Sequence, residues 1–335
     1  MTVNQCSSRA RTYALYTGAP RQLASRVVAA LAPTAPLIPG PAEPAQLLLE
    51  SEVLYQVLSS QRRFFEYPFG IDYVEPTADS LSLHLESNAS LDTLLSGLLP
   101  CRMPMEGGRD EIYGLNGLRI HARSGHGMEL RRLGQPTSLK LTGPSQRAFQ
   151  KAEAALAARV QQQGGQACWL AGDTWTDYER RWEDDRQPLV YEPIWRDAAW
   201  LPSGLLRRLG LLHTVAAPQV VTGHEARLGE WWVLELDYDS DTGLRRAELV
   251  QALTDPDHGL PLELHGHRDL SPGGSLGLML LKAQDRTAAL QLRYDRFEYK
   301  ITPERAEVFK AIQRRISKVT GEASLPSMPE GSATG

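Results

Sequence analysis

The stretch that decides the fold class is Trp231-Trp232-Val233-Leu234-Glu235-Leu236-Asp237-Tyr238-Asp239-Ser240-Asp241. Side chains alternate across a β-strand, so every second residue of this run shares a face. One face would carry only apolar and aromatic groups: Trp232, Leu234, Leu236 and Tyr238. The other would carry four acids: Glu235, Asp237, Asp239 and Asp241. The pattern predicts a strand with one face in a core and the other in water.

A second strand is predicted over 261–268, and four polar side chains would share one of its faces: Glu263, His265, His267 and Asp269. If the two strands are neighbours, carboxylates and imidazoles converge, which suits Mg²⁺, Mn²⁺ or a transition metal. Asp237 and Asp239 are then candidate metal ligands. His265 or His267 would be a ligand or general acid–base group, and Asp269 would orient it.

The same alternation also fits an ordinary sheet face in water, where acids on one strand pair with bases on the next. A third interpretation is an ionic contact with a partner. The sequence leaves these interpretations open, because it does not say which strands are neighbours.

Composition places the chain among soluble globular proteins. Its 335 residues suffice for two domains, and the apolar and charged contents of 42% and 23% are ordinary. No apolar run approaches the roughly 18 residues of a membrane helix, and we expect no secretory signal. Cys6, Cys101 and Cys168 are widely spaced and odd in number, so they predict neither a disulfide framework nor a zinc site. We therefore expect a cytoplasmic protein.

The order of elements predicts an α+β fold with two subdomains, each a mainly antiparallel sheet flanked by helices, joined by a Trp-rich irregular segment. We expect an N-terminal α+β domain over 1–143 and a long helix with the Trp-rich segment over 144–229. A C-terminal α+β domain would follow over 230–319, and then a disordered tail over 320–335. Residues 12–17 are predicted to be a strand. The acid-free N-terminus also admits a targeting segment.

Basic residues are concentrated between 119 and 151, although the whole chain has a net charge of −4. Such a patch can contact phosphates or an acidic partner, so we take it as a candidate nucleic-acid or anion surface. The alternative is a set of scattered, solvated side chains. Arg207-Arg208 and Arg314-Arg315 are expected on solvated helix faces. The candidate surface consists of Arg119, Arg123, Arg131, Arg132, Lys140 and Arg147.

All seven tryptophans lie between Trp169 and Trp232. Aromatic side chains in irregular sequence can pin a long insertion to the core. They can also form a protein interface, because tryptophan contributes disproportionately to binding. The candidate interface residues are Trp175, Trp182, Trp195 and Trp200.

These patterns predict a non-catalytic binding or adaptor subunit of a larger, bacterial-type assembly. It would contact a protein partner through the Trp-rich segment, and nucleic acid through the basic surface. No nucleophile elbow, HExxH or P-loop occurs, so an enzyme is not the favoured interpretation. The alternative is a metal-dependent phosphoryl-transfer or phosphodiesterase enzyme that uses the Asp237/Asp239 and His265/His267 strands. We expect no cofactor, except Mg²⁺ or Mn²⁺ under this alternative.

Overall fold

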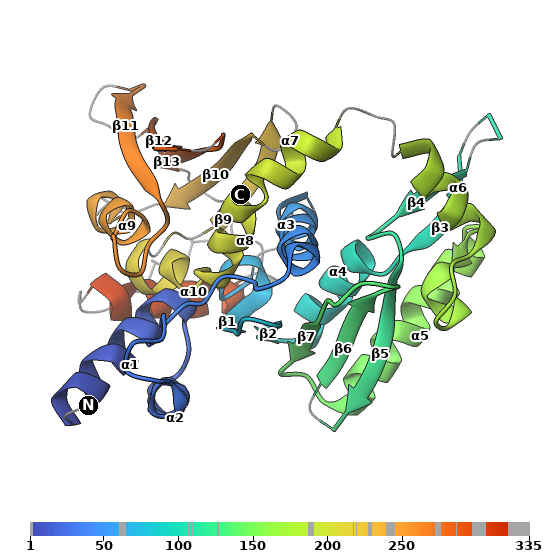
Figure 1. The fold of residues 1–335 in the computed structure, drawn as a ribbon, viewed down its shortest axis with the longest axis horizontal. Coiled ribbons are helices and arrows are strands. Elements are labelled where there is room, and N and C mark those ends of the chain that lie inside the picture. The colour runs from blue at the N-terminus through green and yellow to red at the C-terminus, as the bar shows by residue number, and fades with distance from the viewer. Residues whose placement is uncertain are drawn as a thin grey trace, which may run out of the picture.

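In the computed structural model, the residues described below form three sheets (Figure 1). Two of them have five strands, and we call these the N-terminal sheet and the C-terminal sheet; the third is small. The residues that the structure describes are 3–59, 65–105, 107–108, 110–125, 127–186, 191–216, 218, 220–226, 230–238, 245–271, 276–285, 287–296 and 306–320.

The N-terminal sheet has the order β1-β2-β7-β6-β5, and only the β2–β7 pair is parallel. Helix α5 (Gln146–Gln162) begins at Ser145, whose hydroxyl accepts a hydrogen bond from the Ala148 amide, and it packs beside α4 (Asn88–Leu98). The strands are β1 (Ile71–Pro76), β2 (Leu81–Leu85), β5 (Leu118–Ser124), β6 (Gly127–Arg132) and β7 (Leu139–Thr142).

The C-terminal sheet has the order β11-β12-β13-β10-β9, and only the β10–β13 pair is parallel. Helix α9 (Arg246–Leu253) and the π-helix η3 (Leu212–Ala216) pack against each other beneath it, and α10 (Ala306–Thr320) contacts η3. Its strands are β9 (Val220–Ala226), β10 (Trp231–Tyr238), β11 (Leu262–Asp269), β12 (Leu276–Ala283) and β13 (Ala289–Arg296).

Helices that carry tryptophans connect the two large sheets: α6 (Asp177–Arg186), α7 (Tyr191–Ala198) and α8 (Trp200–Arg207) (Figure 1). The short helix η2 (Cys168–Ala171) precedes them, and the small sheet joins β4 (Asp110–Tyr113), β3 (Cys101–Pro104) and β8 (Gln166–Ala167). The predicted fold class, α+β with two mainly antiparallel sheets flanked by helices, is confirmed. Within the described ranges, no helix is both long and apolar enough to span a membrane.

The expected strand at 12–17 is wrong, because these residues end helix α1 (Val3–Thr17). Ala10, Tyr13 and Tyr16 are buried at a spacing of three, which suits one face of a helix. The Thr17 hydroxyl donates to the Tyr13 carbonyl at 2.7 Å, and Gly18 follows with φ +77°. Glycine adopts this left-handed conformation without strain, so it ends the helix before α2 (Arg21–Ala30).

A buried ion pair joins elements from both halves of the chain. Arg207 on α8 donates to both carboxylate oxygens of Glu50 on α3 (Pro44–Ser59), at 2.7 and 2.6 Å, and both side chains are at most 1% exposed. The same carboxylate accepts hydrogen bonds from Ser203 and Gln46. Arg207 also donates to two backbone carbonyls, those of Pro39 and Thr77. The expectation that Arg207 lies on a solvated helix face is therefore wrong.

Candidate functional site

Strand β10 has the two faces that its sequence predicts. Trp232, Leu234, Leu236 and Tyr238 are buried, whereas Glu235 and Asp237 are half-exposed. We call the buried side of the C-terminal sheet its inner face and the side of Glu235 and Asp237 its outer face. Asp239 and Asp241 lie outside the described residues.

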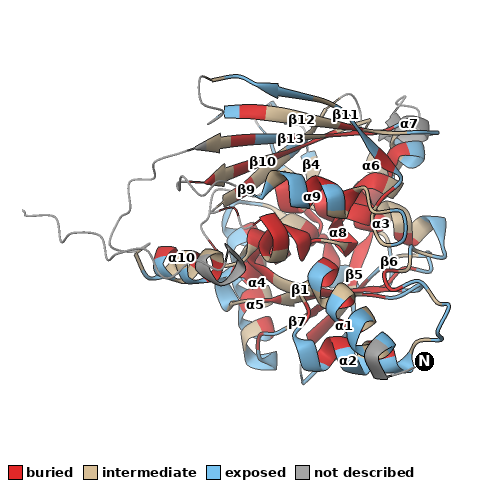
Figure 2. Ribbon diagram, turned by 90° about the vertical axis from the view of Figure 1, so that its left-hand side faces the viewer, coloured by how far each residue is buried: buried red, intermediate tan, exposed pale blue. Residues whose placement is uncertain are grey.

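Strands β10 and β11 belong to the same sheet but are not neighbours. Strands β13 and β12 lie between them. With a spacing of about 4.8 Å per strand, β10 and β11 are about 14 Å apart. Figure 2 shows β11 at the edge of the sheet, with most of its residues exposed. The acids of β10 and the histidines of β11 therefore do not converge as neighbouring strands would require.

A β-bulge at His265 also divides the polar side chains of β11 between the two faces. The register shifts between Leu264 and Gly266, so that His265 has no partner residue on β12. Before the bulge, Glu263 lies opposite Lys282; after it, His267 lies opposite Met279 and Asp269 opposite Gly277. Met279 and Gly277 pair in turn with the buried Leu292 and Tyr294 of β13, which places His267 and Asp269 on the inner face.

The outer face of the sheet holds a groove of about 440 Å³. Asp237 and Asp295 are register partners on the parallel strands β10 and β13, so two carboxylates lie side by side at one end. Glu235 and Arg293 form an ion pair at 3.3 Å. The lining of the groove holds three acids, Glu235, Asp237 and Asp295, and one arginine, Arg293. The groove is also lined by the apolar side chains Leu270, Leu276 and Leu278.

The inner face holds a polar triad at the edge of the sheet: His267, Asp269 and Tyr294. The Tyr294 hydroxyl lies 2.7 Å from His267 Nε2 and donates to Asp269 Oδ1, also at 2.7 Å. His267 Nε2 and Asp269 Oδ1 are 3.2 Å apart. Burial and the Asp269 hydrogen bond raise the pKa of Tyr294 to about 12. Tyr294 can reach β11 because the intervening residue is glycine: a Cβ on Gly277 would lie 2.2 Å from the tyrosine hydroxyl.

Most arginines of the predicted basic surface form ion pairs. Arg123 pairs with Glu153, Arg131 with Glu129 and Arg132 with Glu52. Lys140 and Arg147 are exposed. Nucleic-acid binding stays a prediction, but the positive charge available to phosphates is smaller than the sequence indicates.

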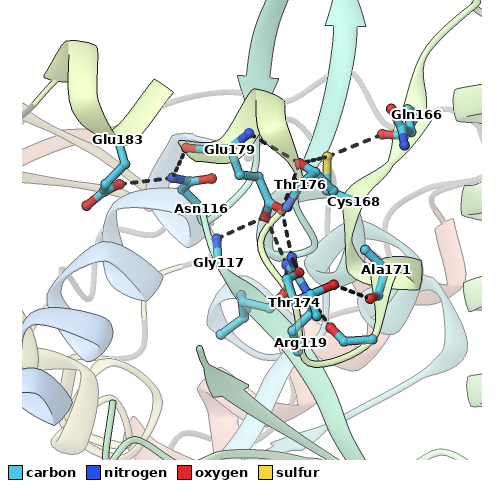
Figure 3. Close-up of polar contacts among 12 residues, drawn as sticks. Asn116, Gly117, Arg119, Gln166, Cys168, Ala171, Thr174, Thr176, Glu179 and Glu183 are labelled. Carbon is cyan, nitrogen blue, oxygen red and sulfur yellow. Dashed lines mark hydrogen bonds and ion pairs between the residues drawn. The ribbon is translucent and has the colours of Figure 1, made fainter. Parts of the chain in front are cut away.

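Arg119 differs from the other arginines of this set because its side chain is only 3% exposed. It donates to both carboxylate oxygens of Glu179, at 2.9 and 2.6 Å, and to the carbonyls of Gly172 and Thr174 (Figure 3). Burial would raise the pKa of Glu179, but hydrogen bonds from Arg119 and Thr176 outweigh it and hold this pKa below its ordinary value. Arg119 of β5 thus links the N-terminal sheet to α6 and to the residues that precede it.

The four candidate interface tryptophans are all half-buried. Trp175 lies against Gly117, where a Cβ would approach its ring to 2.5 Å. Trp195 makes edge contacts with Tyr55 and with the buried Trp232, and both Trp195 and Trp200 pack against the core. For Trp175, Trp195 and Trp200, these contacts favour the packing interpretation. A partner interface at Trp175, Trp182, Trp195 and Trp200 stays a prediction.

A polar cluster that the sequence did not reveal lies where η3 and α10 meet the start of β1. His213 of η3 is 6% exposed, its Nδ1 has no hydrogen-bond partner, and its ring contacts Tyr67 edge-on at 5.1 Å. Arg315 of α10 is 7% exposed and donates to the Pro218 carbonyl at 2.7 Å. The expectation of a solvated face is therefore also wrong for Arg315.

Burial dominates the electrostatics of this cluster. It lowers the pKa of His213 to about 3, and the Arg315 charge acts in the same direction. Burial also raises the pKa of Asp72 to about 6 and that of Glu86 to about 7. The backbone amides of Glu66 and Tyr67 donate to the Glu86 carboxylate and limit its rise. The junction between the two halves therefore contains groups whose protonation differs between the folded and unfolded chain.

The chain matches no protein-family model, and neither a curated protein nor a solved structure matches it.

Proposed function

We propose that this protein is a non-catalytic binding subunit of a larger assembly, and that it receives a basic, partly apolar segment of a partner protein in the outer groove of the C-terminal sheet. The observation that carries the proposal is the groove itself, where the adjacent carboxylates of Asp237 and Asp295 lie beside three leucines that also line it. Leu270 and Leu276 are 46% and 36% exposed, so apolar surface is available beside the acids.

The charge of the groove favours a basic protein segment over nucleic acid as the partner. A lining in which acids outnumber basic residues attracts lysine or arginine and repels phosphate, so this surface suits a basic peptide rather than nucleic acid. Apolar side chains between the basic ones would cover Leu270, Leu276 and Leu278 and remove their surface from water.

The metal-dependent alternative has less support. Among the described residues, no group of three histidine, cysteine, aspartate or glutamate side chains is arranged to hold a metal ion. Glu235 and Asp237 also face away from His267 and Asp269, on the other side of the sheet. The geometry therefore favours binding over metal-assisted hydrolysis at the strands that the sequence singled out.

A peptide titration tests the proposal. The labelled, end-capped peptide Arg-Leu-Lys-Leu-Arg is expected to bind the full chain, and Glu-Leu-Glu-Leu-Glu is not, as measured by fluorescence anisotropy at low salt. The double variant Asp237→Asn/Asp295→Asn should bind the basic peptide about five- to tenfold more weakly. Each exposed ion pair contributes up to about 1 kcal/mol, and 1.4 kcal/mol corresponds to tenfold.

The matched control is Asp79→Asn/Asp92→Asn, which makes the same charge change at exposed positions beside the N-terminal sheet. It should bind the basic peptide like the unaltered protein. Equal binding of the acidic and basic peptides, or an unchanged affinity in Asp237→Asn/Asp295→Asn, would contradict the proposal.

A further inference from the structure

The inner-face triad of His267, Asp269 and Tyr294 has the geometry of a set of metal ligands. Its donor atoms are one imidazole nitrogen, one carboxylate oxygen and one phenol oxygen, separated by 2.7, 2.7 and 3.2 Å. Metal–ligand bonds of about 2.0–2.1 Å place adjacent octahedral donors about 2.9 Å apart and tetrahedral donors about 3.3 Å apart. The three atoms can therefore bind one ion as a face of its coordination shell with little movement.

We propose that His267, Asp269 and Tyr294 bind a transition-metal ion, with ferric iron as the best match. Phenolate and carboxylate oxygens are hard donors and imidazole suits iron, so the set favours a small, highly charged ion. Binding replaces the hydrogen bonds within the triad by metal–ligand bonds. Tyr294 then releases to solvent the proton that it donates to Asp269, because a bound metal ion deprotonates its ligands. The proton on His267 Nε2 is exchanged through solvent for one on Nδ1, which frees the Nε2 lone pair for the metal ion.

Three features of the sheet form this site. The bulge at His265 turns His267 and Asp269 to the inner face, towards Tyr294. Gly277 leaves room for the phenol to cross β12. The side chains of His267 and Asp269 are 43% and 49% exposed, so an ion can enter from solvent and keep positions for further ligands.

Arg246 of α9 adds a positive charge beside the proposed metal site. Its guanidinium lies 4.1 Å from the centre of the Tyr294 ring, and its Nη1 is buried without a hydrogen-bond partner. A ferric ion brings three positive charges to two anionic ligands, so a further anion is needed. Arg246 lies where it could hold such an anion, for example the citrate or nitrilotriacetate with which the iron is supplied.

Titration of the full chain with ferric nitrilotriacetate tests the site. Saturable binding should produce a visible phenolate-to-iron charge-transfer band, which a site without tyrosine does not give. The band should be absent in Tyr294→Phe and present in the control Tyr113→Phe, which alters an exposed tyrosine on β4. His267→Ala should lower the affinity about tenfold or more, the scale on which residues of metal sites act.

Gly277→Ala offers a second test, because the added methyl group displaces the Tyr294 hydroxyl and should abolish the band. Tyr294→Phe removes only the hydroxyl, so its fold can be checked by circular dichroism. An equal band in Tyr294→Phe would overturn the proposal. So would the absence of saturable Fe³⁺, Zn²⁺ and Mn²⁺ binding by the unaltered, folded protein.

Discussion

Replacing Arg207 by methionine is expected to lower the free energy of unfolding by about 3–5 kcal/mol, because the change leaves Glu50 as a buried carboxylate without its cation. The two carbonyls that Arg207 satisfies, of Pro39 and Thr77, would also lose their donor. Urea denaturation followed by circular dichroism measures the effect. A loss of this size would show that the pair between α3 and α8 stabilises the fold.

The control for this experiment is Arg314→Met, an exposed position on α10, which should change stability by no more than about 0.5 kcal/mol. The double variant Glu50→Leu/Arg207→Met should recover much of the loss, since it removes both charges together. A loss below about 1 kcal/mol in Arg207→Met would contradict the buried pair.

Replacing His213 by leucine is expected to change the pH dependence of stability. The folded pKa of His213 is about 3, so this histidine stays neutral in the folded chain while the unfolded chain takes up a proton near its ordinary value of 6.5. Its contribution to stability is complete above about pH 6.5 and is lost as the pH falls, by about 1.4 kcal/mol per pH unit. The variant His213→Leu has no imidazole to protonate at this position, so it does not lose this stability as the pH falls.

Asp72 and Glu86 act in the opposite sense, because the folded chain retains their protons up to about pH 6 and 7. Their contribution falls as the pH rises from about 4 to 7 and partly masks that of His213. The informative quantity is therefore the difference between variant and unaltered protein. Between pH 7.5 and 4.5 this difference should move by about 2–3 kcal/mol in favour of His213→Leu.

Urea denaturation at about pH 7.5 and 4.5 measures this difference in stability between His213→Leu and the unaltered protein. The control is His121→Leu, which changes an exposed histidine of β5. The control should follow the pH dependence of the unaltered protein. If His213→Leu did the same, burial of a neutral histidine at this junction would be refuted.

Local patterns predicted the parts of the structure that local interactions decide. The alternation of Trp232, Leu234 and Leu236 predicted β10 and its buried face, because a strand with one face in a core must alternate. The long helix expected from residue 144 is α5, and the Ser145 hydroxyl caps its start. Residues 12–17 were misread because a short apolar run fits strand and helix alike.

The candidate sites depend on contacts between residues that are distant in the sequence. Arg207 and Glu50 are 157 residues apart, and Tyr294 lies 27 residues from His267. Alternation also predicted one shared face for the polar side chains Glu263, His265, His267 and Asp269. The bulge at His265 instead places His267 and Asp269 on the opposite face from Glu263. One signal was available: Thr176 and Glu179 have the spacing of a helix capping box, which indicated that Glu179 is held in place.

Hydrogen–deuterium exchange of the full chain, with and without the peptide Arg-Leu-Lys-Leu-Arg, tests the proposed binding function most directly. We predict slower exchange confined to β10, β12 and β13, the strands that line the outer groove. Protection in the tryptophan helices α6 to α8 instead, or no protection at a saturating peptide concentration, would contradict the groove as the binding site.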